Sequence, residues 1–225
     1  MHADIPAQAL AADGVRFKVL AQIFPVLRHE TLAPLSNATL AVAMLRQTPE
    51  GASADALQQR CQRLASDLQH MLEDSVNVVR DLDQWLVDNG ARLPADVLLR
   101  QCRKLLFSQL MWSKRQVRWP DEAAAVELPA FTSRYLVMAW LLCMLPWLPE
   151  GGELVLDASA TDVWHADFSA ASQAPATPQL FDAQDIALLA EASGWRLERQ
   201  PQRWSLHLPA CLLYTSPSPR DKRQS

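Results

Sequence analysis

Glycine is scarce in this chain of 225 residues, which has six glycines against fifteen prolines. Loops that hold the phosphates of a nucleotide use glycine, because only glycine lets the backbone approach without a side chain in the way. Strong charge of either sign is also lacking, since 21 basic and 25 acidic residues give a net charge of −4. That balance gives no electrostatic reason to expect nucleic acid as a partner. With 49% hydrophobic residues, the chain is nevertheless apolar enough to bury a core.

Long apolar runs are missing as well. The longest covers residues 136–149 and contains two prolines, which makes it too short and too broken to span a bilayer. No basic stretch followed by an apolar segment stands at the start, so no secretory signal is expected. The cysteines form no CxxC pair and favour neither a zinc site nor a disulfide framework: they are Cys61, Cys102, Cys143 and Cys211. These absences predict a cytoplasmic protein with free thiols, no metal and no membrane or nucleic-acid partner.

Two long amphipathic helices are predicted in the first 88 residues. Apolar residues recur at alternating spacings of three and four over residues 17–45, and again over residues 57–85 after a break at residues 48–51. This heptad spacing is typical of helices packed along one seam. The predicted seam consists of Phe17, Leu20, Phe24, Leu27, Thr31, Pro34, Ala38, Ala41 and Leu45, with Leu57, Cys61, Leu64, Leu68, Met71, Ser75, Val78, Leu82 and Trp85. We expect an antiparallel hairpin over residues 14–88, after a disordered start at residues 1–13.

The apolar stripes are wider than one seam requires. The additional residues are Leu32, Leu35, Leu40, Val42, Met44, Leu72, Val79 and Leu86. A lone hairpin cannot bury so wide a face, so two copies are expected to pair into a four-helix bundle.

Residues 92–209 predict a second, α+β domain, which makes the chain α plus α/β overall. Helices are expected at residues 94–115, 132–145 and 182–193. Strands are expected at residues 116–119, 126–128, 153–157, 163–168, 195–199 and 203–208.

His29 is the candidate reactive residue. If Leu27 and Thr31 lie in the seam, helical spacing turns His29 towards solvent, with Glu30 beside it. A neutral imidazole is a good nucleophile near pH 7, and an adjacent carboxylate can orient it. An outward histidine on a rigid helix suits phosphoryl transfer, because the donor must reach it from outside. The alternative is an incidental surface histidine. Pro34 normally kinks a helix, which indicates that the segment tolerates or uses a kink.

The segment His29-Glu30-x-x-x-Pro34-Leu35 resembles the phosphoacceptor box of sensor histidine kinases. The order of expected elements over residues 14–209 is similar to theirs too: a dimerisation and phosphotransfer hairpin, then a small sandwich like their ATPase domain. The resemblance implies a homodimer in a two-component phosphorelay, in which His29 exchanges a phosphoryl group with aspartates of response-regulator receiver domains. It also implies that the Mg²⁺ used in transfer belongs to the receiver.

The departures from this family concern the nucleotide. Active members hold Mg²⁺ and nucleotide through asparagines on the helix before a Gly-Gly turn, but Trp140 and Met144 stand near those positions here, and neither offers an oxygen ligand. Residues 158–181, where a glycine-rich lid belongs, contain no glycine. A degenerate ATPase domain without autokinase activity is therefore expected. Trp140 and Trp147 are candidates to fill the lost pocket. Asp157, Asp162 and Asp167 are candidates for a remnant of the aspartate that contacts the nucleotide in this family. The alternative is that they are ordinary carboxylates on exposed strands or loops.

Several alternatives stay open. Leu32, Leu35, Leu40 and Met44 either dock a receiver below His29 or belong to the bundle core. Ala33 stands where members with phosphatase activity often carry Thr or Asn, so little such activity is expected. The chain could instead be a non-catalytic adaptor or inhibitor of a kinase or receiver, or an ATP-dependent kinase with an atypical nucleotide site.

Residues 211–225 begin with Cys211-Leu-Leu-Tyr-Thr-Ser-Pro-Ser-Pro-Arg-Asp, which resembles a translated sequencing adapter. We expect this tail to be artefactual, the alternative being an ordinary polar tail.

Overall fold

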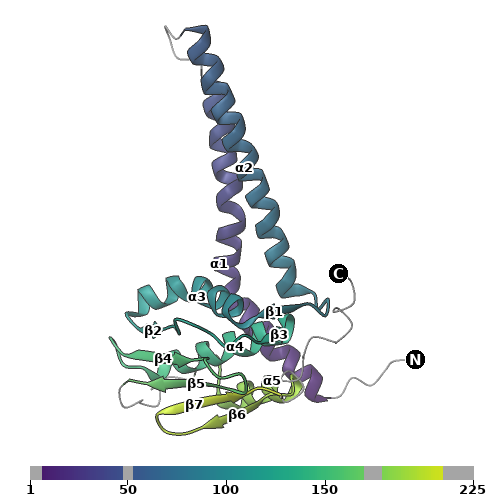
Figure 1. The fold of residues 1–225 in the computed structure, drawn as a ribbon, viewed down its shortest axis with the longest axis vertical. Helices are drawn as coiled ribbons and strands as arrows, with labels where there is room; N and C mark the ends of the chain where they lie inside the picture. The colour runs from purple at the N-terminus through teal and green to yellow at the C-terminus, as the bar shows by residue number, and fades with distance from the viewer. Residues whose placement is uncertain (1–6, 48–52, 170–178, 210–225) are drawn as a thin grey trace, which may run out of the picture. The chain divides into compact units, whose positions relative to one another are not determined.

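The chain was analysed as a computed structural model, which describes residues 7–47, 53–169 and 179–209. It divides into two compact units (Figure 1). The hairpin unit spans Ala21–Val87, and the α/β unit combines the chain up to Leu20 with the chain from Asp88 onwards. The tail at residues 211–225 lies outside the described residues.

The hairpin unit is built from the part of α1 (Ala7–Leu45) that follows Leu20 and from α2 (Ala54–Leu86), and these helices run antiparallel as predicted (Figure 1). Ser53 caps α2, because its Oγ accepts a hydrogen bond from the backbone N–H of Ala56 at 3.3 Å. The guanidinium of Arg60 donates to the carbonyls of Met44 and Gln47 at 2.8 and 3.0 Å. These carbonyls lie at or just after the end of α1, and that of Met44 also accepts from the backbone N–H of Gln47 at 3.3 Å. Arg60 thus joins the two helix ends.

The seam of α2 is largely as predicted, and that of α1 only in part. Along α2, Ser75 and Trp85 are buried and the other predicted seam residues are half-buried, except that Cys61 is exposed. The prediction was wrong for Phe17 and Phe24, which are 71% and 47% exposed. Val15, Val19, Ile23 and Leu27 are buried instead. Their spacing of four drifts away from a seven-residue repeat, which moves the buried face around the helix.

Helix α1 begins at Ala7, so the predicted disorder was wrong for residues 7–13. Alanine has the highest helix propensity, and Ala7, Ala9, Ala11 and Ala12 stand in this stretch. Ala12 is also almost completely buried, with 1% of its surface exposed. Residues 1–6 lie outside the described part of the chain.

A mixed five-stranded sheet forms one layer of the α/β unit. Its order is β2 (Gln116–Arg118), β4 (Glu153–Asp157), β5 (Val163–Phe168), β7 (Arg203–His207) and β6 (Arg196–Arg199). Strands β2 and β4 pair in parallel and the remaining neighbours are antiparallel. A separate two-stranded sheet pairs β1 (Arg92–Pro94) with β3 (Glu127–Pro129). The sequence did not predict β1, because three residues are too few to show an alternating pattern.

The helices of this unit are α3 (Ala95–Ser113), α4 (Ala130–Met144) and α5 (Ala183–Ala192), and the 3-10 turn η1 (Leu145–Trp147) follows α4. A capping box starts α5, in which the Asp182 side chain accepts from the backbone and the Asp185 side chain accepts in return. Thirteen residues of α4 are buried, among them Leu136 and Met138 with no exposed surface. The expected fold, a helical hairpin followed by a small α+β unit, is confirmed.

Candidate functional site

His29 is exposed and lies within α1 of the hairpin unit. At 3.6 residues per turn, the buried residues Leu27, Ala38 and Ala41 lie about 120–180° around the helix from it. The imidazole therefore stands on the side of α1 opposite its contact with α2. Glu30 follows and is half-buried. Neighbouring residues on a helix do not face each other, so the orienting role of Glu30 stays a prediction.

Two prolines, Pro25 and Pro34, flank His29 inside a helix that continues through both. Neither has an N–H to donate to the carbonyl four residues earlier. Between them, the hydroxyl of Thr31 donates to the carbonyl of Leu27 at 2.8 Å. The segment with His29 is thus a stretch of α1 with fewer backbone hydrogen bonds than an ordinary helix.

The exposed apolar residues of α1 fall into two sets. Leu32, Leu40 and Met44 are 51%, 61% and 42% exposed, and all lie within about 60° of His29 around the helix. Leu35 and Val42 are 43% and 38% exposed, but they lie about 120–140° from His29, on the flank of the seam. The four residues predicted as docking or bundle residues are therefore not equivalent, because Leu35 faces differently from the other three.

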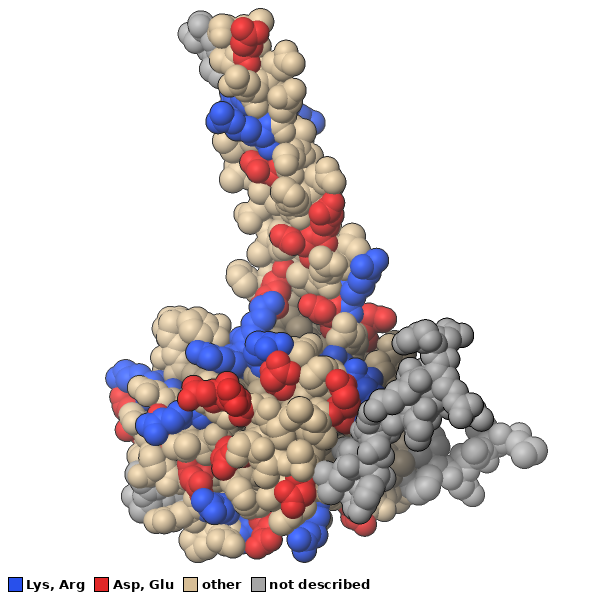
Figure 2. All heavy atoms as spheres, viewed as in Figure 1, with Lys and Arg blue, Asp and Glu red and all other residues tan. Residues whose placement is uncertain are grey.

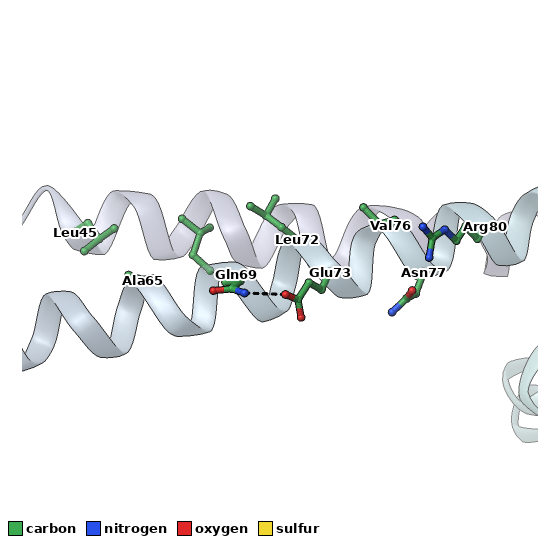
Figure 3. A pocket seen from close by; sticks show the side chains of 9 residues that line it. Leu45, Ala65, Gln69, Leu72, Glu73, Val76, Asn77 and Arg80 are labelled. Carbon is green, nitrogen blue, oxygen red and sulfur yellow. Dashed lines mark hydrogen bonds between the residues drawn. The ribbon is translucent and has the colours of Figure 1, made fainter.

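Helix α2 carries a matching apolar flank. Leu72, Val76 and Val79 are 49%, 51% and 52% exposed and are spaced by four and three residues. A shallow groove of about 690 Å³ runs along this flank, with Leu45, Leu68, Leu72 and Val76 among its lining residues (Figure 3). Polar side chains border it, including Gln69, whose amide donates to Glu73 at 2.9 Å (Figure 3). Within one chain, this apolar surface stays exposed to solvent.

In the α/β unit, Trp140 and Met144 are 1% and 0% exposed. Both of these positions are thus interior. Trp147 is half-buried and packs edge-on against Trp204, with ring centroids 6.1 Å apart. The indole of Trp140 fills core space, whereas Trp147 lines a surface hollow together with Phe181 and Arg199.

The first turns of α1 pack against α4 and α5. The Nζ of Lys18 lies 2.9 and 3.0 Å from the two carboxylate oxygens of Asp185 on α5. The guanidinium of Arg16 lies over the ring of Phe131 on α4, 5.6 Å from its centroid. Burial raises the pKa of the nearby Tyr135, and the charge of Arg16 opposes that shift. This contact, absent from the predictions, helps to explain why so little of α4 is exposed.

The three candidate relic aspartates are engaged in local structure. Asp157 Oδ1 accepts from the backbone N–H and the hydroxyl of Ser159, and these bonds lower the pKa of Asp157. Asp167 forms a two-pronged ion pair with Arg203 at 2.6 and 2.8 Å. Asp162 is exposed, and its carbonyl accepts from the N–H of Leu208. Their surroundings fit the plain surface interpretation.

Among the described residues, no group of three His, Cys, Asp or Glu side chains is placed to hold a metal ion. The described helices also include none with the length and hydropathy needed to cross a membrane.

No protein-family model matches the sequence, and no curated protein matches it either. Solved structures with a similar fold include the cytoplasmic segment of the histidine kinase QseC (TM-score 0.42, 16% identity, covering 58% of this chain and 91% of that one). The Acinetobacter baumannii histidine kinase AdeS has a TM-score of 0.43 at 11% identity. That match covers 80% of this chain and 97% of the AdeS chain. The histidine kinase ThkA, in complex with the response regulator TrrA, has a TM-score of 0.42 at 11% identity. That match covers 92% of this chain and 68% of the ThkA chain.

Proposed function

We propose that this chain is a histidine phosphotransfer protein of a two-component phosphorelay, acting as a homodimer. The observation that carries the proposal is the position of His29, exposed on α1 and opposite the helix's contact with α2. There a phosphorylated aspartate of another protein has access to the ring. Pro34 stands five residues later, as in the phosphoacceptor box that the segment resembles.

In the transfer step, an unprotonated ring nitrogen of His29 attacks the phosphorus of a receiver's aspartyl phosphate. The new P–N bond forms as the P–O bond to the aspartate breaks, and the aspartate leaves as a carboxylate. The Mg²⁺ that offsets the charge of the phosphoryl oxygens belongs to the receiver. Glu30 orients the imidazole, and the reverse reaction passes the group to a second receiver.

The apolar surface of the hairpin supports the homodimer. Leu35 and Val42 on α1 and Leu72, Val76 and Val79 on α2 flank the seam and remain about half exposed. A second hairpin laid against this flank would bury them, producing a four-helix bundle. Leu32, Leu40 and Met44 share the face of His29, so we assign them to receiver docking and Leu35 to the bundle core.

The α/β unit supports transfer without ATP. Trp140 and Met144 are buried apolar side chains, and α4 has little exposed surface on which a nucleotide could sit. We therefore propose that phosphate enters from a receiver and not from ATP. With Ala33 near His29, no side chain at that position can orient a hydrolytic water, so phosphatase activity should be weak.

The decisive experiment uses receiver domains labelled with ³²P from acetyl phosphate. We expect the purified chain to take up acid-labile label, the His29→Ala variant to take up none, and the matched variant His70→Ala to behave as wild type, because His70 is an exposed histidine on α2. A wild-type chain that stays unlabelled against every receiver tested would remove the proposal and leave the adaptor function.

A second measurement separates transfer from autokinase activity. Saturating MgATP should leave the melting temperature unchanged, because a ligand stabilises a fold only when it binds the folded state. Transfer of label from γ-³²P-ATP to His29 would instead show a working kinase with an atypical nucleotide site.

A further inference from the structure

The outward side of α3 in the α/β unit carries large apolar side chains that the fold does not use. Phe107 and Met111 are 64% and 58% exposed there and lie about 40° apart around the helix. The opposite side of the helix buries Leu98, Cys102 and Leu105 beneath it. A helix that is apolar on both sides, with one side in water, indicates a surface that is covered by something else.

These side chains border a groove between α3 and the sheet. Its volume is about 470 Å³, and its lining includes Phe107, Leu110 and Met111 of α3 with Val117 of β2. Strand β2 is an edge of the five-stranded sheet, so no further strand closes this side. Phe107 and Met111 are four residues apart, which places them on adjacent turns as a ridge against which another helix can pack.

The groove is positively charged. Arg103, Lys114 and Arg115 line it, and no aspartate or glutamate is among its lining residues. Lys114 forms an exposed ion pair with Glu150, and Arg115 donates through Nε to the carbonyl of Leu148. Figure 2 shows lysine and arginine side chains, with aspartate and glutamate side chains among them, over the part of the unit where Figure 1 places α3 and β2. A partner must therefore supply both apolar side chains and negative charge.

We propose that this groove, which we call the α3 groove, binds an acidic amphipathic helix of another protein. Large apolar side chains of that helix lie against Phe107 and Met111, and its carboxylates face Arg103 and Arg115. Helix-in-groove binding of this kind draws its affinity from the apolar anchors and its selectivity from the charges around them. A lipid surface fits less well, because Phe107 and Met111 form walls of a hollow into which a partner's side chain enters.

The groove acts independently of His29, so its test does not depend on phosphotransfer. The probe is a fluorescein-labelled synthetic amphipathic helix of about five turns with glutamates on its polar face and leucines on the other. Its counterpart carries lysine in place of every glutamate. Fluorescence anisotropy with the full chain should show binding of the acidic probe, weakened by added salt, and none of the basic one.

Two variants and two controls locate the binding. Phe107→Ser and Arg103→Glu should each weaken binding by about tenfold or more, as expected for anchors of a small interface. The controls are Leu180→Ser, at a leucine 50% exposed in the same unit, and Arg196→Glu on β6, the opposite edge of the sheet. Both should bind as wild type, and unchanged melting temperatures of all four variants would exclude unfolding as the cause.

Three outcomes would overturn the proposal: equal binding of the two probes, acidic binding that persists in Phe107→Ser, or binding lost equally in the control variants. Vesicles of phosphatidylglycerol and phosphatidylcholine form the last arm. If such vesicles bind the chain through Phe107 while the acidic helix does not, the occupant is a lipid surface and the proposed protein partner is wrong.

Discussion

The two units of this chain bury their apolar side chains to very different degrees. In the α/β unit, Leu136, Val137 and Leu141 on α4 have no exposed surface. In the hairpin unit, Leu72, Val76 and Val79 on α2 keep about half of theirs. Two helices meet along one seam, whereas a helix on a sheet with neighbours on both sides can be enclosed. One unit thus completes its core within the chain, and the other leaves an apolar flank.

The largest difference between the two units is expected when a side chain is shortened in the enclosed core. Leu136→Ala should destabilise the α/β unit by about 2–5 kcal/mol, since it removes buried contacts and leaves a cavity. Leu32→Ala, at a residue 51% exposed on the hairpin, should change the stability by less than about 0.5 kcal/mol. Near-ultraviolet circular dichroism during urea unfolding measures both, and equal losses would contradict the contrast.

Replacing exposed apolar residues of the hairpin by glutamate tests whether a second copy of the hairpin covers them in solution. The double variant Leu72→Glu with Val79→Glu should turn a dimer into a monomer, because burying two unpaired carboxylates costs several kcal/mol. Sedimentation equilibrium measures the change. Leu40→Glu, on the face of His29, should leave the dimer intact. A wild-type monomer at all concentrations would refute the four-helix bundle.

The buried cysteines of the α/β unit make its stability depend on pH. Burial raises the pKa of Cys102 and of Cys143 to about 12, with the charge of Arg134 opposing the shift at Cys102. Folding therefore favours the protonated thiols. Their contribution to stability is complete below the ordinary pKa of 9.0 and is lost as the pH rises from 9 towards 12, at up to about 1.4 kcal/mol per pH unit for each thiol.

We expect Cys102→Ala to reduce this slope, measured by urea unfolding at several pH values. In a Cys211→Ser background, a thiol reagent at neutral pH should label the exposed Cys61 quickly and leave Cys102 and Cys143 unmodified. Rapid labelling of all three would show that the α/β unit is not closed.

The smallest expected effect concerns the start of α1. Lys18→Met removes the ion pair with Asp185, whose side chain is 13% exposed, and should cost about 0.5–1 kcal/mol. Amide hydrogen exchange should accelerate in the first turns of α1. Lys114→Met, which removes the ion pair with Glu150 between side chains at least 70% exposed, should have no measurable effect on stability.

Residues with strong local signals were predicted well. Strands β4 and β5 have the predicted bounds, because alternating apolar residues and flanking turns define them. The exposed position of His29 agrees with the predicted seam. Its role as phosphoacceptor stays a prediction, as do the roles of Glu30 and Pro34.

Other features depend on partners distant in the sequence. Phe17 and Phe24 fit the heptad spacing of the predicted seam, but they are exposed, and Val15, Val19 and Ile23 are buried in their place. Met111 shares an apolar pattern with the core residues of α3 but is 58% exposed. Periodicity shows that a face is apolar, and it does not show which of two apolar faces a sheet or helix will cover.

The sequence alone determined the antiparallel hairpin, the order of the α+β elements and a histidine on the outer side of a helix, since all three follow from local spacing and propensity. Only the tertiary structure decided that α4 is enclosed, that the first turns of α1 pack on α4 and α5, and that α3 keeps an apolar side in water. Burial of this kind depends on contacts between segments far apart along the chain, and no local pattern encodes which segments meet.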